Sequence, residues 1–332
     1  LLLLCVSMAL PALRQVPLKM LPFDNKNEFQ LVLDFPEGTT LEAADRTVRE
    51  FENFLAGVPE VTDFTAYVGL ASPMDFNGMV RHYYLRGGPH VADIRVNLAP
   101  KDQREAQSHA IVLRLRKPLS KIAHQHGVNL KIVETPPGPP VMSTITAEVR
   151  GQPDSSYADL IAGAHRLKAV MQSEPGVVDI DVSSEAERMR LDFVVDKEKA
   201  ALHGVSTSQI IQSLRLALSG ASPATVHLPH ERQSLMVRMI LPRAKRSSLA
   251  SLGQIPVRTA AGQVLPLAEL GSFQEMPAEQ PIYHKDLERV AFVYAEVAGR
   301  SPATAILDIQ DKLAQDPLPK GTSADFAGEG EW

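Results

Sequence analysis

The sequence predicts an α+β protein built from two similar sandwiches, the second of which is interrupted by an inserted α+β segment. A proline-rich run over residues 136–142 separates the two. Proline lacks a backbone N–H and fixes φ, so this run forms neither a helix nor a central strand. Before it the pattern predicts strand, helix, strand, strand, helix, strand, the split β-α-β order of ferredoxin-like sandwiches. The same order returns afterwards, with residues 188–281 placed in its middle.

Composition limits the classes of function. A chain of 332 residues suggests more than one domain, and 44% hydrophobic residues can build real cores. A net charge of −5 with only 5% aromatic residues predicts no nucleic-acid partner. Cys5 is the only cysteine, which excludes an internal disulfide framework and a CxxC metal site.

Residues 27–135 are expected to form the first sandwich. Glu28–Phe35 alternates apolar and polar residues, which predicts a half-buried strand. Thr39 and Glu42 have the spacing of a capping box, so a helix is expected to follow Thr39. Further strands are expected at residues 61–68, 80–85, 92–98 and 129–134, with a loop at 69–79 and a helix at about 105–126.

The second sandwich is expected in two pieces, residues 143–187 and 282–332. Asp154 is expected to cap its first helix, and Ser301 its second, with Pro302 in the first helical position. Its strands are expected at residues 144–149, 178–182, 290–297 and 322–327.

The insertion, residues 188–281, is large enough to be a domain and is expected to project, since insertions are tolerated at exposed tips. Ser206 and Gln209 form another capping box, which predicts a helix start. Residues 221–229 and 234–241 are expected to pair as a hairpin arm.

Residues 1–26 begin with an apolar run that is shorter than the roughly 20 residues of a membrane span. We interpret this part as the end of a transmembrane helix and the segment leading from it. An ordinary buried segment is the alternative.

The sequence contains no G-x-S-x-G elbow, Walker A loop, H-E-x-x-H motif or G-x-G-x-x-G fingerprint, so no catalytic residue and no enzymatic activity are expected. Arg81 and Asn77 resemble the residues of small hydrolases with this fold, but a doubled sandwich with an insertion does not suit such an enzyme. No metal site is expected, because His227 and His230 lie in a hairpin without a third His or Cys. Asp179 and Asp181 are expected to form a solvated strand edge.

The loop at 69–79 and the linker carry apolar side chains that suit a pocket for varied apolar ligands. These side chains are Met74, Phe76, Met79, Val141 and Met142. The alternative is that they close a core between the two sandwiches.

Four stretches then resemble a known family. They are LPFDNKNEFQLVLDFPEGTTLEAA, STITAEVRG, VDKEKAALHGVSTSQIIQSL and AAGQVLPLAELGSF, in this order. Together they resemble the second large periplasmic loop of a resistance-nodulation-division (RND) efflux transporter, the inner-membrane pump of tripartite drug-export systems. The resemblance implies two porter subdomains, at 27–135 and at 143–187 with 282–332, and a docking subdomain at 188–281.

The resemblance also implies a proton-driven pump that exports hydrophobic or amphiphilic compounds by alternating access. It implies a homotrimer in the cell inner membrane, with this portion in the periplasm, an adaptor (membrane fusion) protein and an outer-membrane channel. No cofactor is expected, since the proton-motive force acts on a membrane domain outside this chain.

Substrate contacts are implied on the first strand, the loop and the strand after the linker. These candidates are Gln30, Leu31, Leu33, Met74, Phe76, Met79, Val141, Met142 and Thr144. The candidate residues of a partner-docking hairpin are Thr225, His227, Pro229 and His230.

Two alternatives stay open. Copper and silver exporters of the family use three methionines, and Met79 and Met142 fall near two of those positions, whereas Leu31 occupies the third. Two thioethers are a poor site for a soft metal. A free-standing periplasmic binding or adaptor module is the other alternative.

Overall fold

The structure, a computed structural model, describes residues 24–135 and 142–328. Contacts divide the chain into two compact units: Leu1–Ala186 with Gln280–Trp332, and Glu187–Glu279. We call them unit 1 and unit 2. Residues 1–23 of the expected N-terminal segment and residues 136–141 of the expected linker lie outside the described part.

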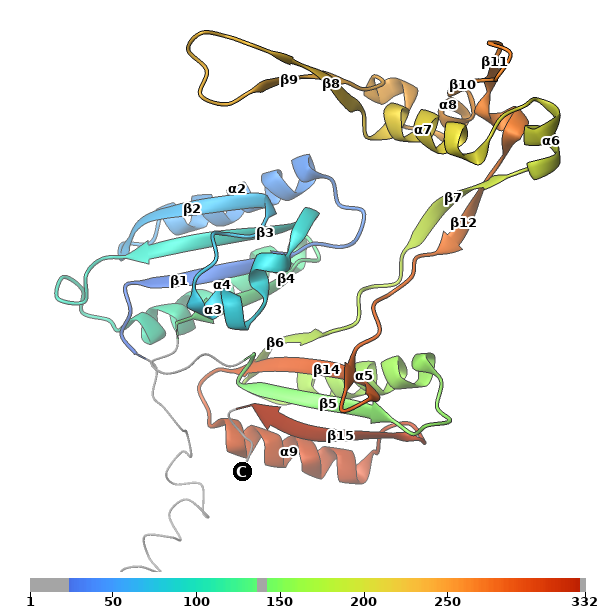
Figure 1. Ribbon diagram of the computed structural model, residues 1–332. Helices are drawn as coiled ribbons and strands as arrows, with labels where there is room; N and C mark the ends of the chain where they lie inside the picture. The colour runs from blue at the N-terminus through green and yellow to red at the C-terminus, as the bar shows by residue number, and fades with distance from the viewer. Residues whose placement is uncertain (1–23, 136–141, 329–332) are drawn as a thin grey trace, which may run out of the picture. The chain divides into compact units, whose positions relative to one another are not determined.

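Sandwich A of unit 1 is a four-stranded antiparallel sheet covered by two helices (Figure 1). Its strand order is β2-β3-β1-β4, the order of a split β-α-β sandwich. The strands are β1 (Glu28–Asp34), β2 (Val61–Leu70), β3 (Gly87–Leu98) and β4 (Asn129–Glu134), and the helices are α2 (Leu41–Ala56) and α4 (Ser108–Gln125).

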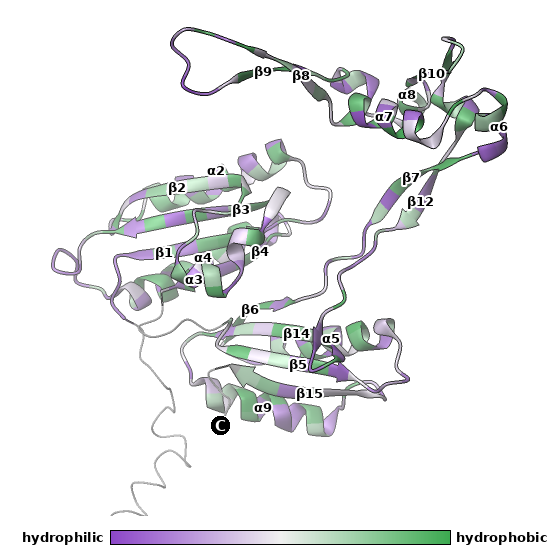
Figure 2. Ribbon diagram, in the orientation of Figure 1, coloured by the Kyte–Doolittle hydropathy of each residue, from purple (hydrophilic) through white to green (hydrophobic). Residues whose placement is uncertain are grey.

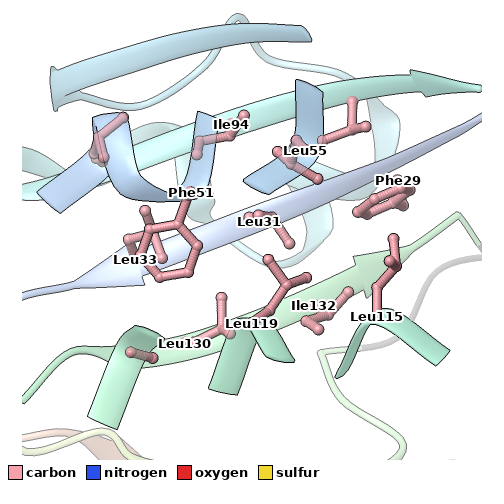
Figure 3. Packing of buried hydrophobic residues seen from close by; sticks show 14 of the residues in the cluster. Phe29, Leu31, Leu33, Phe51, Leu55, Ile94, Leu115, Leu119, Leu130 and Ile132 are labelled. Carbon is pink, nitrogen blue, oxygen red and sulfur yellow. The ribbon is translucent and has the colours of Figure 1, made fainter. Parts of the chain in front are cut away.

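The core of sandwich A lies between this sheet and the two helices, which contact each other (Figure 3). Side chains alternate along a strand, so Phe29, Leu31 and Leu33 of β1 all point to the helices and are at most 2% exposed. They meet Phe51 and Leu55 of α2. The opposite face of β1 carries Gln30, Val32 and Asp34.

Sandwich B of unit 1 repeats this topology with strands from both sides of the insertion. The order β6-β14-β5-β15 is antiparallel, and the short β13 (His284–Lys285) pairs with one end of β14. The strands are β5 (Ile145–Gly151), β6 (Val177–Val182), β14 (Glu288–Val297) and β15 (Thr322–Gly328), and the helices are α5 (Tyr157–Gln172) and α9 (Pro302–Gln315). The predicted α+β class with two split β-α-β sheets is confirmed.

Unit 2 is a smaller α+β body on a two-stranded ribbon of β7 (Met189–Val195) and β12 (Gly271–Pro277) (Figure 1). Its core cluster contains Ile210, Ile255, Val257, Leu267 and Leu270. The other elements are α6 (Lys197–Leu202), α7 (Thr207–Leu218), β8 (Ala221–Val226), β9 (Leu235–Met239), η2 (Arg243–Lys245), α8 (Leu249–Gly253), β10 (Pro256–Arg258), β11 (Val264–Pro266) and η3 (Leu267–Leu270).

Two features predicted for unit 2 are confirmed. Ser206 and Gln209 form a capping box at the start of α7. The strands β8 and β9 pair as a hairpin, and its tip is hydrophilic in Figure 2. Among the described residues, the structure contains no helix with the length and apolar character of a membrane span.

Three local predictions were wrong. Thr40, not Thr39, is the N-cap of α2, and Ser156, not Asp154, caps α5 in a capping box with Asp159. The expected strand at 80–85 is replaced by two short helical segments, α3 (Phe76–Val80) and η1 (Tyr83–Leu85). Asp75 caps α3 by accepting a hydrogen bond from Gly78, so a local cap overrides the apolar pattern.

Candidate functional site

The candidate site lies in unit 1, on the face of the sheet of sandwich B (sheet B) that carries no helix. In β5 and β14 one set of alternating residues fills the core, including Ala147 and Val293. The other set points away from the helices and lines a cavity of about 930 Å³. This set consists of Thr146, Glu148, Phe292, Tyr294 and Glu296. The volume lies in the range of small-molecule pockets.

One part of the cavity is aromatic and apolar. Phe292 and Tyr294 stack with ring centroids 5.9 Å apart and an interplanar angle of 9°. Burial raises the pKa of Tyr294, so its hydroxyl stays neutral at physiological pH. Tyr283 and Met142 also line the cavity. Such a surface binds flat apolar groups by burial and stacking.

The other part of the lining is charged, with Asp34, Arg86 and Lys131 from sandwich A and Asp181 from β6 of sandwich B. Lys131 Nζ lies 2.5 Å from Asp34 Oδ2 and 2.5 Å from Asp181 Oδ2. Arg86 Nη2 lies 2.5 Å from Asp34 Oδ1. Burial alone would raise the pKa of Asp34, but the charges of Lys131 and Arg86 together lower it to about 2. The Asp34 carboxylate on this side of the cavity therefore remains ionised at neutral pH.

Asp179 and Asp181 do not form the solvated strand edge that was predicted. Asp179 has a side chain only 5% exposed, is paired with Arg116 of α4, and accepts a hydrogen bond from the Ile132 amide at 3.0 Å. Burial raises the pKa of Asp179, although Arg116 opposes the shift. The prediction failed because β6 contacts β4 of sandwich A, which strand alternation within sandwich B does not reveal.

Arg81 joins the connection between β2 and β3 to sandwich B. Its Nη1 lies 2.6 Å from Glu296 Oε1, and the other Glu296 oxygen accepts a hydrogen bond from the hydroxyl of Thr144. Burial disfavours the charge of Arg81, but Glu296 raises its pKa above the usual value. Arg81 is thus held by a carboxylate, unlike the anion-binding arginine of a hydrolase.

The structure separates the residues predicted to contact substrate. Leu31 and Leu33 are 0% exposed in the core of sandwich A, so their assignment as contacts was wrong. Gln30 is 6% exposed and bonds to Ser72 and Asp93. The prediction assigned residues from both faces of β1 to the substrate site. Side chains alternate along a strand, so the two leucines point towards the helices.

The remaining candidates that the structure describes lie at two places. Met142 lines the cavity, and Thr144 borders it through Glu296. Met74, Phe76 and Met79 are 60%, 63% and 42% exposed on the connection between β2 and β3. Val141 lies outside the described residues.

The residues of the candidate docking hairpin lie on and beyond β8. Thr225 is half-buried with its hydroxyl 3.4 Å from the Met236 sulfur, whereas His227, Pro229 and His230 are exposed. Across the described part of the chain, no group of three or more His, Cys, Asp or Glu side chains is arranged to hold a metal ion.

Sequence reasoning missed the aromatic and acidic floor of the cavity. The signal was present, because Phe292, Tyr294 and Glu296 alternate with the apolar core residues of a strand. A split β-α-β sheet has its helices on one face, so the second set of a central strand marks the open face.

Comparisons with known proteins give three findings. A family model described as the AcrB/AcrD/AcrF family matches residues 1–331. The nickel and cobalt resistance protein CnrA of Cupriavidus metallidurans is 25% identical over 195 residues, which cover 57% of this chain and 18% of that protein. The multidrug resistance protein MdtC of Klebsiella pneumoniae is 23% identical over 244 residues, covering 70% of this chain and 22% of that protein.

A solved structure shares the fold. The crystal structure of a heavy metal efflux pump superposes with a TM-score of 0.76 at 17% identity, covering 99% of this chain and 33% of that one. The chain spans about a fifth of the length of the curated relatives it matches.

Proposed function

This chain belongs to the AcrB/AcrD/AcrF family of RND transporters, and from that premise we propose that it is the periplasmic porter and docking portion of a proton-driven efflux pump for hydrophobic or amphiphilic compounds. In this proposal the sandwiches are the porter subdomains, at 27–135 and at 143–187 with 282–332. Residues 188–281 are the docking subdomain. The pump is a homotrimer that works with an adaptor protein and an outer-membrane channel.

The cavity on sheet B is the observation that supports this cargo. Its floor offers the Phe292–Tyr294 stack and Met142, which suit an apolar body. Its rim carries Lys131 and Asp181, which suit a polar or charged end. A pocket with an apolar floor and a few charged groups is the pattern expected for an amphiphile.

Alternating access in this proposal consists of the two sandwiches of unit 1 opening and closing around that cavity. Arg81–Glu296, Arg116–Asp179 and Lys131–Asp181 are ion pairs that join sandwich A to sandwich B. Opening the cavity means breaking these pairs, and closing it means remaking them.

Metal export is the second candidate function. The similarity to CnrA, described as a nickel and cobalt resistance protein, favours it. Met142 supplies one thioether to the cavity, and Met79 lies on the connection whose residues 80–83 line it. A cation cargo would need further ligands, and Asp181 or Glu296 would first have to leave its present partner.

A binding experiment distinguishes the two functions. We expect a hydrophobic cationic dye to bind the purified chain with micromolar affinity in fluorescence polarisation. Tyr294→Ala should weaken this binding about 10-fold, because a stacked aromatic contributes about 1 kcal/mol beyond its buried area. Tyr67→Ala on β2, a tyrosine outside the cavity lining, is the matched control and should leave the affinity unchanged.

The same titration includes Ni²⁺, Co²⁺ and Cu⁺ in place of dye. Metal binding that is lost in Met142→Ala but kept in Met276→Ala, with no dye binding, would overturn the organic cargo in favour of the metal. Equal dye affinity in wild type and Tyr294→Ala would show that the cavity on sheet B is not the binding site.

A further inference from the structure

The long connection between β2 and β3, residues 71–86, presents apolar side chains to solvent while its two ends are anchored. Met74, Phe76 and Met79 are exposed, but Ser72 near its start is 7% exposed. Arg86 at its end has a side chain only 15% exposed. Ser72 and most of the Arg86 side chain are therefore buried, whereas the apolar middle of the segment is exposed.

Both ends are held by the same carboxylate. Asp93 of β3 is 0% exposed. Its Oδ2 accepts hydrogen bonds from the backbone N–H of Ser72 at 2.7 Å and from Gln30 Nε2 at 3.0 Å. Its Oδ1 forms an ion pair with Arg86 Nη1. One buried side chain thus reaches the first and the last turn of the segment.

Neighbouring groups add to each end separately. At the start, Arg95 donates to the Ser72 hydroxyl at 3.3 Å and pairs with Asp75 at 2.7 Å. At the end, Arg86 donates to the Leu33 carbonyl at 2.8 Å and to Asp34. Asp93 is the group that belongs to both sets.

The energetics make this arrangement strongly coupled. A fully buried carboxylate is stable only when its charge is paired and its oxygens are hydrogen-bonded, and Asp93 has both. If the charge is removed, Arg86 loses a buried partner and the Ser72 amide loses a charge-assisted bond. Loss of one group therefore loosens the segment at both ends.

We infer that Asp93 is a positioning residue that fixes residues 71–86 at both ends and thereby places Met74, Phe76 and Met79 for contact with cargo. This inference rests on the proposed function, since it assigns these side chains to cargo. Arg81 in the same segment reaches Glu296, so the placement set by Asp93 extends to the floor of the cavity.

The test uses Asp93→Asn, which keeps the shape of the side chain and removes its charge. Hydrogen exchange should become at least about 10-fold faster in residues 71–86 and stay unchanged in β5 and β14. Asp63→Asn on β2 is the matched control, because this exposed carboxylate lies on the same sheet and bonds to Asn97 rather than to the segment. It should leave exchange in 71–86 unchanged.

A spectroscopic readout reports the position of the segment itself. Phe76→Trp in a Trp332→Phe background places the only tryptophan on the segment. Adding Asp93→Asn should shift its emission and change its quenching by acrylamide, and should weaken dye binding several-fold. Arg86→Lys, a milder second variant, should raise exchange more in 81–86 than in 71–75.

Each outcome decides the inference. Unchanged exchange in 71–86 in both Asp93→Asn and Arg86→Lys overturns the anchoring. Faster exchange with unchanged dye affinity overturns the positioning role. If exchange is faster in Asp93→Asn but the wild-type chain binds no dye, the anchoring is supported and the proposed cargo is contradicted. The anchoring and the proposed function can therefore fail separately.

Discussion

Asp34 shows how one residue in the charged rim contributes to stability. Lys131 and Arg86 lower its pKa to about 2, below its ordinary value of 3.8. A carboxylate with a lowered pKa stabilises the fold above the unfolded value, and this stabilisation is lost as pH falls from about 4 towards 2. The shift corresponds to about 2 kcal/mol of unfolding free energy.

We therefore expect Asp34→Asn to be less stable than wild type by up to about 2 kcal/mol at pH 6 in urea unfolding, because the ionised carboxylate is lost. The difference should shrink as the pH is lowered through 4 to 2. A difference that stayed constant over this range would mean that Asp34 acts through packing rather than through its charge.

At the scale of the element, the N-cap of α5 is Ser156, although the sequence pattern suggested Asp154. The Ser156 hydroxyl accepts a hydrogen bond from the Asp159 amide at 3.1 Å, and the Asp159 carboxylate accepts one from the Ser156 amide at 2.9 Å. Asp154 lies before this box, in the turn between β5 and α5.

Ser156→Ala should destabilise sandwich B by about 1 kcal/mol, since it removes one side of a capping box. Asp154→Ala is the control and should change stability by less than about 0.5 kcal/mol. Thermal or urea unfolding measures both. Equal losses in the two variants would contradict the assignment of the cap to Ser156.

The elements of each sandwich were largely predictable because their alternation or helical period extends over many residues. The helix α4 continues through Pro118, and β3 is longer than expected because it begins at Gly87. The short α3 and η1 could not be predicted, since they depend on one cap and one turn rather than on a period.

At the scale of the whole molecule, unit 2 leaves and rejoins unit 1 at neighbouring points. The Ala278 amide donates to the Arg188 carbonyl at 2.9 Å, and the Gln280 side chain donates to the Glu185 carbonyl at 3.0 Å. The two chain ends at the base of the insertion are therefore adjacent. Unit 2 also has a core cluster of its own.

Replacing residues 187–279 by a short Gly-Ser linker should leave unit 1 folded, because closing adjacent ends costs little entropy. We expect the melting temperature of this variant, measured by circular dichroism, to lie within about 4 °C of the value for unit 1 in the full chain. Extending the deletion through β6 should abolish this transition, since β6 pairs with β14. If unit 1 were unfolded in the first variant, this would contradict the expectation that unit 1 folds without unit 2.

The sequence by itself determined the α+β class, the two split β-α-β sheets and the family resemblance, because these depend on periodic patterns and local motifs along the chain. The tertiary structure decided where the candidate site lies. Leu31 and Leu33 belong to the core, while Phe292 and Tyr294 form the floor of the cavity.

The burial of Asp179 also followed only from the tertiary structure. The physical reason is that burial and ion pairing depend on which strands and helices meet. Asp179 meets Arg116, 63 residues away along the chain, and Asp93 holds Ser72, 21 residues away. The spacing of residues along the sequence does not predict these contacts.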